Sequence, residues 1–561
     1  MKTEDIKQRF EALKSQRSTV KQIWDVIEQF VAPLHGGKMF QEQNSEHSIE
    51  WRRREVFDST AVESCQSLAA SLHGSLTSPL VQWFDLRFRD EDLRKHSEAA
   101  AWLEKCSDMT YQALRDSDFS LEANEVYIDL VAFGTAALVE EPADGPDDWN
   151  GINFSSVPIR EVFFEVDAKD RPLRFYRRLE WTPLQILDKF GDACPDEIRQ
   201  KADATQGIDS RHDVIFCVYK REKGVPWAGQ QLAPKQREYG FKYMLLDSAT
   251  QLGDEGGYYE MPAFLPRWRK TSGSVWGFSP AMTALSDILT LNQLVELILK
   301  ATAKVIDPVI FANERDILAD LDMEGGTLNV VRDINGFRPF ESGARFDVSQ
   351  LQRETLTNSI RRQFFIDQLQ LKESPAMTAT EVQVRYEMMQ RLLGPTLGRL
   401  QADFLDPCVV RTFNILWRGG QLPEPPEVVA QAASGGQLDI DYLGPMPRAQ
   451  KMEQVAGFER LVQFALMAAQ ASPEILQGIK WDDMLREAGQ LLGVPSDMVM
   501  GEEELGALRE QIAEQQAAQQ EAMMQQQQAA TAKDAGQGMK SVAEAEAIGG
   551  DNVRPMVAPG G

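Results

Sequence analysis

The sequence is poor in cysteine and histidine, with five of each among its 561 residues. The cysteines stand at positions 65, 106, 194, 217 and 408, too far apart for a CxxC metal or redox site. An odd and sparse set of cysteines predicts buried thiols in a protein that folds in a reducing compartment. The histidines are equally scattered. We therefore expect no metal site in this chain.

The sequence also lacks a long hydrophobic run. Its best apolar stretch, Leu294–Leu299, is interrupted by Glu296 and followed by Lys300, whereas a membrane span needs roughly 18 consecutive apolar residues. The N-terminal stretch MKTEDIKQRFEALKSQR is charged throughout and contains no apolar signal-peptide segment. We therefore expect no membrane partner and a product that stays in the cytoplasm where it is made.

The common catalytic motifs are missing as well. A phosphate-binding loop needs GxxxxGK followed by Ser or Thr, but Gly37-Lys38 is followed by Met39, and Ala32 stands where the first glycine is required. The sequence contains no GxSxG, HExxH or EF-hand pattern. With 85 acidic residues, close carboxylate pairs arise by chance and identify no site. These absences predict that the chain is not an enzyme and uses no cofactor.

The composition is otherwise that of an ordinary globular protein with an acidic bias. Hydrophobic residues make up 43% and charged residues 26%, so the chain can bury a large core, and its length suggests two to four domains. The 59 basic and 85 acidic residues give 59 − 85 = −26. A mean field of this sign repels phosphate and argues against a protein that wraps nucleic acid over its whole surface.

Hydrophobic spacing predicts a helical first quarter followed by a β-rich module. Runs such as HDVIFCVYKRE predict a mixed, mostly antiparallel module from about 150 to 268. The other expected elements of this half are helices over 1–33, 51–77, 96–115, 119–140 and Pro183–Phe190 and a strand over 83–88.

The second half is dominated by long helices. Ser279 and Pro280 form a start signal for a helix over 279–304, and its leucines and isoleucines cover more than one face, so it must pack between neighbours. Short strands with glycine-rich turns are expected between 309 and 345. Further helices are predicted over 347–371, over 380–417 with kinks at Gly394-Pro395 and Asp406-Pro407, and over 447–513. The fold class is α+β and mostly helical.

Several basic and aromatic clusters allow two interpretations. Salt bridging is favoured over DNA contact for Arg52-Arg53-Arg54, and pairing with the acidic surplus is expected for Arg177-Arg178 and for Arg267 and Arg269. For Arg361-Arg362, an ion pair and a position near nucleic acid are equally compatible with the sequence. Trp83-Phe84 and Trp276 are base-stacking candidates, but large aromatic residues of this kind are more often core.

The order of the elements resembles the portal proteins, or head-to-tail connectors, of short-tailed (podovirus) double-stranded DNA bacteriophages. The resemblance covers about residues 1–425 and rests on local patterns that occur in order: a helix ending at Pro33, DSTA at 58–61, LTSP at 76–79 before Trp83-Phe84, PRW at 266–268, WGFSP at 276–280, MTATEV at 377–382, LGP at 393–395 and Asp406-Pro407. Each pattern is short, and their order and spacing carry the resemblance.

The resemblance implies a portal-type fold with wing, stem, clip and crown, assembled as a cyclic ring, usually a dodecamer, around a central DNA channel. The expected parts are the wing over 1–278 (helical 1–140, β-rich 150–268), a first stem helix over 279–304, the clip over 305–346, a second stem helix over 347–371, a channel loop over 372–379, the long wing helix over 380–425, crown helices over 447–513 and a Gln/Ala-rich extension with a disordered tail over 514–561.

The same resemblance supplies candidate site residues. The DNA-channel candidates are Arg361, Arg362, Lys372, Glu373, Ser374, Pro375, Ala376, Met377 and Thr378. The candidates for docking at the clip are Arg332, Phe337, Arg338, Phe340 and Arg345. Stem packing between subunits is assigned to Leu285, Ile288, Leu291, Leu294, Leu297 and Ile298.

The implied function is structural. The ring would sit at one capsid vertex of the virion after assembly in the host cytoplasm, and double-stranded DNA would pass through it during packaging and ejection. Its implied partners are the terminase motor, tail adaptor or tail tube proteins, and the scaffold and major capsid proteins. Two alternatives stay open from the residues alone: a metal-dependent nuclease or hydrolase that uses clustered acids, and a non-portal oligomeric scaffold or adaptor of the virion.

Overall fold

The chain forms two compact units, and the structure describes most of the first unit but only parts of the second. The first unit comprises Met1–Arg87, Leu103–Glu424 and Leu438–Glu453, and the second comprises Phe88–Trp102, Pro425–Gln437 and Gln454–Gly561. The computed structural model describes residues 1–33, 56–79, 81–90, 93–94, 96–142, 151–203, 210–227, 231–271, 273–306, 310–311, 338–339, 346–366, 393–431, 438–442, 455, 457–467 and scattered single positions beyond 480.

The N-terminal part of the first unit is helical, as predicted. Its helices are α1 (Thr3–Phe30), α3 (Thr60–Leu76), α5 (Ser97–Asp116, which begins in the second unit) and α6 (Phe119–Phe133). The predicted helix over 119–140 is wrong at its end. Gly134 adopts φ +79° and terminates α6, and the chain continues as strand β2 (Leu138–Pro142).

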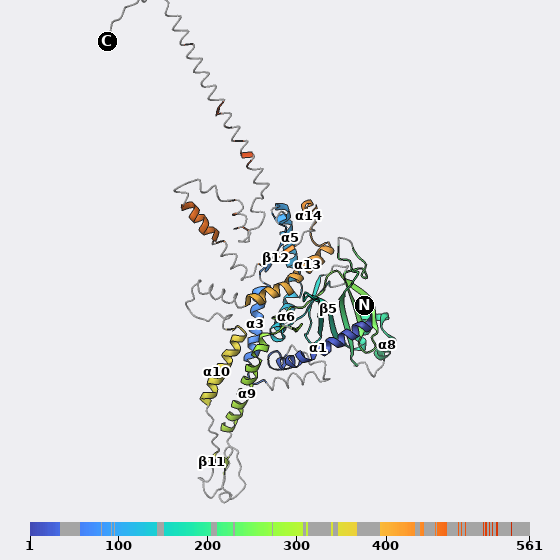
Figure 1. The fold of residues 1–561 in the computed structure, drawn as a ribbon, viewed down its shortest axis with the longest axis vertical. Coiled ribbons are helices and arrows are strands. Elements are labelled where there is room, and N and C mark those ends of the chain that lie inside the picture. Colours follow the sequence, from blue (N-terminus) through green and yellow to red (C-terminus); the bar gives the residue numbers. More distant parts are fainter. Residues whose placement is uncertain are drawn as a thin grey trace, which may run out of the picture. The chain divides into compact units, whose positions relative to one another are not determined.

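A five-stranded antiparallel sheet forms the β-rich module and confirms that prediction. Its strands follow the order β4-β5-β6-β7-β8, with bounds Val162–Val166, Pro172–Trp181, His212–Lys220, Tyr239–Leu245 and Gln251–Tyr258. Helix α1 covers one face through Ile6 and Phe10. Helices α7 (Pro183–Phe190) and α8 (Asp196–Asp203) cover part of the other face (Figure 1).

Two smaller sheets among the described residues pair segments that are far apart in the sequence. A three-stranded sheet has the order β3-β2-β9, from Ile152–Ser156, Leu138–Pro142 and Ala263–Phe264. A two-stranded sheet pairs β1 (Phe84–Phe88), which confirms the strand predicted over 83–88, with β12 (Leu438–Tyr442). Strand β12 was not predicted. It brings a segment that follows the proline-rich LPEPPE stretch back against the N-terminal part of the chain.

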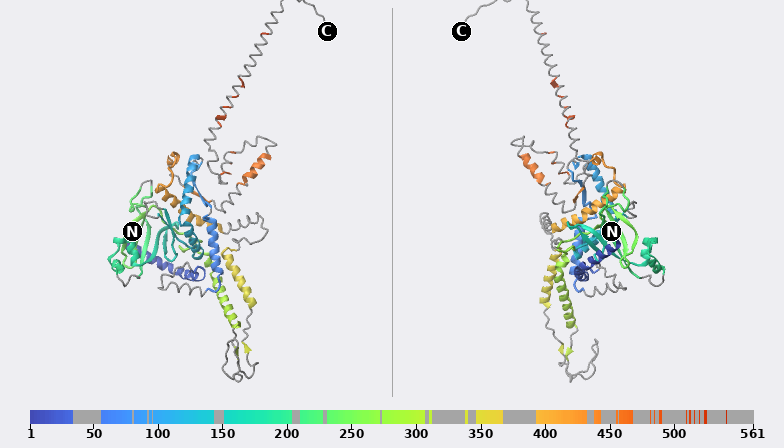
Figure 2. Two further views of the ribbon diagram at one scale, coloured as in Figure 1. Left: turned by 180° about the vertical axis from the view of Figure 1, so that it is seen from behind. Right: turned by 45° about the vertical axis from the view of Figure 1, so that its right-hand side comes forward.

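Two long helices form an antiparallel hairpin. Helix α9 (Pro280–Ile306) and helix α10 (Phe346–Gln363) lie side by side in both views of Figure 2. Of the residues between them, only Ile310–Phe311 (β10) and Arg338–Pro339 (β11) are described, and these pair antiparallel. The start of the first helix agrees with the prediction, whereas the second ends at Gln363 rather than at 371.

The next helical stretch contains a wider turn. Residues 393–400 are helical, Gln401–Leu405 form a π-helical turn, and α13 (Asp406–Arg418) follows. Pro407 explains the position of this turn, because proline has no N–H for the carbonyl four residues earlier and its ring crowds that carbonyl. The kink predicted at Asp406-Pro407 is therefore present as a π-helical turn.

The second unit is described only in pieces. Helix α14 (Glu427–Gln431) and a helical stretch over 457–467 belong to it. The stretch over 457–467 presents exposed apolar side chains at Leu461, Phe464, Leu466 and Met467. Helicity here agrees with the prediction for 447–513, of which most positions lie outside the described residues, as does most of 514–561.

Candidate functional site

The start of α9 is fixed to the body of the first unit by short backbone contacts. Ser279 Oγ donates to the carbonyl oxygen of Ala132 at 2.8 Å and accepts from the backbone N–H of Met282 at 2.9 Å. The backbone N–H of Gly277 donates to Thr135 Oγ1 at 2.8 Å. A Cβ atom at Gly134 would lie 2.6 Å from the Gly277 carbonyl oxygen, so only glycine fits there.

One face of α9 is buried within the chain. Its buried residues recur every three or four positions, which places them along a single face: Pro280, Ala281, Ala284, Ile288, Leu291 and Val295. Ile288 and Leu291 are 4% and 1% exposed. The family resemblance assigns both residues to packing between subunits. Their side chains are already covered by their own chain, so we do not propose that role for these two residues.

Polar contacts join α9, α10 and the start of α3 near the body. Asp287 Oδ2 accepts hydrogen bonds from Ser359 Oγ at 2.7 Å and from Gln363 Nε2 at 2.8 Å. Asn292 Oδ1 accepts from the backbone N–H of Phe57 at 2.7 Å. The hairpin is therefore held in a defined direction at its base.

The outer part of the hairpin exposes large apolar side chains. Leu297 is 56% exposed, Leu351 66% and Ile306 78%, and Leu299, Val305 and Val348 are each about half exposed. We call these six residues the hairpin apolar strip. Leu285, Leu294 and Ile298, the other residues assigned to packing between subunits, are half-buried.

Helix α9 is also long and apolar enough to cross a membrane, and only 22% of its most apolar 18-residue stretch is buried. Core helices of soluble proteins can have the same length and composition, so this property alone identifies no partner. The exposed residues of α9 point to more than one side of the helix, because positions 297 and 299 are about 200° apart, so a partner on each side would be needed to cover them.

The channel and docking candidates are described only in part. Arg361 and Arg362 lie in the last turn of α10 and are exposed. Phe365 follows with φ +59°, a left-handed conformation that ends the helix earlier than predicted. Lys372–Thr378, Arg332, Phe337, Phe340 and Arg345 lie outside the described residues, and Arg338 is described only as part of the β11 backbone.

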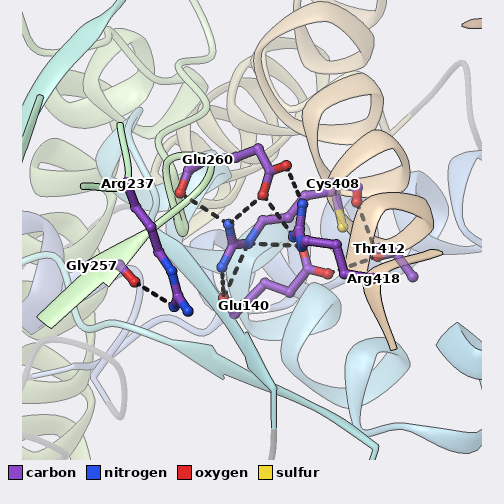
Figure 3. A network of polar contacts seen from close by, with 8 residues as sticks. Glu140, Arg237, Gly257, Glu260, Cys408, Thr412 and Arg418 are labelled. Carbon is purple, nitrogen blue, oxygen red and sulfur yellow. Dashed lines mark hydrogen bonds and ion pairs between the residues drawn. The ribbon is translucent and has the colours of Figure 1, made fainter. Parts of the chain in front are cut away.

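A buried polar network ties α13 to the three-stranded sheet (Figure 3). The Arg411 side chain, 4% exposed, donates to the carbonyl oxygens of Glu140 and Glu260 at 3.0–3.3 Å. Arg418 donates to both carboxylate oxygens of Glu260, at 2.6 and 2.9 Å. Thr412 Oγ1 donates to Glu140 Oε1 at 2.8 Å. These contacts fix α13 firmly within the first unit.

Glu140 is the most unusual titratable group of this network. Its side chain is fully buried, and burial raises the pKa of its carboxyl to about 8, against the lowering effect of Arg411 and the Thr412 hydrogen bond. Its Oε2 lies 3.8 Å from Arg411 Nε, and no hydrogen bond to this oxygen is present among the described residues. A carboxyl with this pKa is largely protonated at neutral pH.

No pattern in the sequence predicts this network. Glu140 and Arg411 lie 271 positions apart, and neither belongs to a motif. The predicted ion pairs are confirmed for Arg177, Arg178 and Arg267. Arg177 pairs with Glu161 at 2.8 Å, and Arg178 pairs with Asp213 at 2.9 Å. Arg267 pairs with Asp170 at 2.9 Å, as expected from the acidic surplus, whereas Arg52–Arg54 lie outside the described residues.

Two of the three aromatic candidates for base stacking, Trp83 and Phe84, are core residues, as the sequence favoured, whereas Trp276 is partly buried. Trp83 and Phe84 are 3% and 0% exposed. Trp276 makes edge contacts with Trp24 and Phe164, with ring centroids 5.0 and 4.9 Å apart. All five cysteines are free and buried, which confirms the prediction of buried thiols.

Comparison with known proteins relates the whole chain to phage connectors. The chain is 26% identical to the probable portal protein of Bordetella phage BPP-1 over 533 residues, covering 91% of this chain and 90% of that protein. It is 25% identical to the portal protein of Salmonella phage epsilon15 over 522 residues, covering 90% of each chain.

Solved structures with some likeness include the neck of an empty GTA particle, at TM-score 0.34 and 10% identity, covering 72% of this chain and 88% of that chain. The virion of the native gene transfer agent particle gives TM-score 0.30 and 10% identity, with 73% and 87% covered.

The family described as "Bacteriophage head to tail connecting protein" matches residues 3–499. This match covers most of the chain, including both long helices of the hairpin and the helix over 393–418. The chain therefore belongs to the family of bacteriophage head to tail connecting proteins, which confirms the resemblance found in its motifs.

Proposed function

We propose that this chain is the portal subunit of a bacteriophage, a structural protein of the virion at the junction of head and tail. Membership of the connector family and the similarity to two phage portal proteins along nine tenths of the chain support this function. The family membership also agrees with the prediction that the chain is not an enzyme.

The observation that carries a ring is the hairpin apolar strip. Covering one exposed leucine fully is worth about 1.5–3 kcal/mol, so leaving several of them in water is costly. A neighbouring copy of the same chain can cover the strip in a head-to-tail interface. Such an interface, repeated around an axis, closes into a ring. We propose that α9 and α10 form the stem of this ring through Leu285, Leu294, Leu297 and Ile298 together with the strip.

The remaining parts follow the chain order of the family resemblance. The five-stranded sheet and the helices around it would form the wing, 305–346 the clip, 372–379 the channel loop and 447–513 the crown. The ring, which we take to be a dodecamer, would conduct double-stranded DNA. The clip, with Arg332, Phe337, Arg338, Phe340 and Arg345, would dock the terminase and later the tail adaptor. Arg361, Arg362 and the loop Lys372–Thr378 would contact the DNA.

The acidic character of the chain fits a conduit. Twelve copies would carry about 12 × 26 formal negative charges. A lining that bound phosphate strongly would slow moving DNA, so a mostly acidic wall with a few exposed arginines supports passage rather than tight binding.

Native mass spectrometry with negative-stain imaging tests the ring. We expect a closed ring of about twelve copies with a central hole wide enough for duplex DNA. The variant Leu297→Asp places a charge on the hairpin apolar strip and should shift the protein to monomers. Gln293→Asp, which changes an exposed polar residue of the same helix, adds the same charge and should leave the ring intact.

Three outcomes would contradict the proposal. If the wild-type chain stayed monomeric at micromolar concentration, a neighbouring copy of the chain could not be the partner that covers the strip. Equal effects of Leu297→Asp and Gln293→Asp would mean that charge alone, rather than the apolar strip, controls assembly. Flotation of the wild-type chain with neutral lipid vesicles, lost in Leu297→Asp, would instead assign the strip to a membrane.

A further inference from the structure

The π-helical turn Gln401–Leu405 lies next to a helix that cannot move easily. On its C-terminal side, α13 is held by the buried contacts of Arg411 and Arg418 with Glu140 and Glu260. A π-helical turn contains one residue more than an α-helical turn, so the residues before it are rotated by about 100° relative to a continuous α-helix. Any change in this turn would therefore act on the segment that precedes it.

Arg267 lies against the π-helical turn and is almost completely buried, at 2% exposure. Its Nη1 donates to Asp170 Oδ1 at 2.9 Å and to the Val275 carbonyl oxygen at 3.4 Å, and its Nη2 donates to the Asp170 carbonyl oxygen at 3.0 Å. Asp170 itself stands in a turn with φ +64° and also pairs with Lys270. Arg267 is thus anchored to the turn between β4 and β5.

Asp403 stands in the π-helical turn and faces Arg267 without reaching it. Its Oδ2 lies 4.0 Å from Arg267 Nη2, which is about 1 Å longer than a charge-assisted hydrogen bond. This oxygen and Arg267 Nε are both buried, and neither makes a hydrogen bond with the described residues. Two complementary groups that face each other at this distance would gain a strong hydrogen bond if a rearrangement of the turn brought them about 1 Å closer.

The electrostatic surroundings of Asp403 agree with an ion pair to Arg267 that lacks a direct hydrogen bond. Burial raises the pKa of its carboxyl, the nearby Arg267, Lys270 and Arg399 act in the opposite direction, and Asp170 adds to the rise. A carboxylate that accepted the bond from Arg267 would instead be stabilised in its charged form. In the present position of the turn, the attraction between Asp403 and Arg267 is therefore weaker than it would be with a direct hydrogen bond.

From this geometry we propose that the π-helical turn Gln401–Leu405 is a two-position joint whose second position is closed by a hydrogen bond between Asp403 and Arg267. In the present position, Pro407 favours the wide turn, and Asp406 N–H donates to the Gln401 carbonyl oxygen. In the second position the turn tightens and Asp403 joins Asp170 on the guanidinium of Arg267. Arg267 has enough donors to hold both carboxylates.

The buried residues before the turn explain why the present position is the resting one. Leu393, Leu397 and Leu400 are 1%, 7% and 0% exposed, so rotating this segment would move apolar side chains away from their contacts. The wild-type chain at rest therefore stays in the present position, and a load, a partner or the loss of Pro407 is needed to populate the second one. The joint would couple the segment before it to the β4–β5 turn through Arg267.

The test is a double-mutant cycle read by hydrogen exchange with mass spectrometry on the full-length protein. Pro407→Ala restores the missing N–H and removes the ring that widens the turn, so exchange in peptides over 399–407 should slow about tenfold. Asp403→Asn should change exchange less than twofold in the wild-type background, where the bond is not made. In the Pro407→Ala background it should undo most of the tenfold protection, which corresponds to a coupling of about 1.4 kcal/mol.

A matched control and a second variant keep the outcome clear. Asp196→Asn removes a carboxylate that is 90% exposed on α8 and should change nothing in either background. Asp403→Glu lengthens the side chain by one methylene, enough to reach Arg267 without moving the helix, and should slow exchange in the present position. Equal effects of Asp403→Asn in both backgrounds would overturn the joint and leave Asp403 with a static role, as would unchanged exchange in Asp403→Glu.

Discussion

The buried carboxyl of Glu140 gives the sharpest prediction for stability. Its pKa of about 8 in the folded chain exceeds the ordinary value of 4.5, so the folded state binds this proton more strongly than the unfolded state. The resulting contribution to stability is fully present below pH 4.5 and is lost as pH rises through 8. At pH 9 the folded state must hold a buried carboxylate or release its contacts.

The size of the effect follows from the shift. The difference of 8 − 4.5 = 3.5 pKa units corresponds to at most about 5 kcal/mol of stability lost between acid and alkaline pH. In a unit of roughly 400 residues, whose unfolding entropy is about 2.1 cal/mol/K per residue, this loss lowers the Tm by about 6 °C. Glutamine has the shape of a protonated glutamate and carries no titratable proton.

The variant Glu140→Gln should therefore match the wild type in Tm at pH 5 and exceed it by several degrees at pH 9. Scanning calorimetry or differential scanning fluorimetry between pH 5 and pH 9 measures this difference. Glu197→Gln, on α8 with a side chain that is 75% exposed, is the matched control and should shift neither value.

The opposite sign would refute the reasoning. If Glu140 is ionised and paired with Arg411 at neutral pH, glutamine leaves a buried guanidinium without its counter-charge. Glu140→Gln would then lower the Tm at pH 7 and pH 9 alike. A pH-independent loss of this kind would show that the attraction of Arg411 outweighs the cost of burying the Glu140 carboxylate. The predicted pH dependence requires the cost of burial to be the larger of the two.

Two further predictions concern how the first unit is held together. Gly134→Ala should abolish soluble folding or lower the Tm strongly, because Gly134 has φ +79° and a Cβ there would meet the Gly277 carbonyl oxygen at 2.6 Å; Gly74→Ala, with open space inside α3, should leave the Tm unchanged or raise it. Arg17→Met should cost about 3 kcal/mol and speed hydrogen exchange of α1, because it removes charged hydrogen bonds to three backbone carbonyls. Arg9→Met, which breaks one half-exposed ion pair, should do neither.

The sequence predicts helices and strands best where local residues mark their first or last position. The Ser279-Pro280 pair predicts the start of α9 to within one residue, because the capping hydroxyl and the fixed φ of proline act locally. The helix predicted over 119–140 fails at Gly134 for the opposite reason. The small apolar residues after this glycine are compatible with a helix, and only pairing with β3 and β9 makes them a strand.

The sequence predicts where the long helices of the hairpin lie in the chain, but it does not predict which residues their side chains contact. The apolar pattern of α9 predicts that the helix packs on several faces, and it cannot distinguish a neighbouring copy from the rest of the same chain. Ile288 and Leu291 are covered by their own chain, whereas Leu297 is 56% exposed. The buried network around Arg411 had no sequence signal at all, because its partners come from segments more than 150 positions away.

The glycine contact at the base of α9 has a geometric consequence for the proposed ring. Rings of twelve and thirteen copies differ by only about 2° in the rotation from one subunit to the next. A side chain at this joint could adopt several rotamers and tilt the helix by more than that amount. Direct contact between the backbones of Gly134 and Gly277 leaves no rotamer to choose, so it allows little variation in the direction in which α9 leaves the body, and every subunit of the proposed ring would have the same direction.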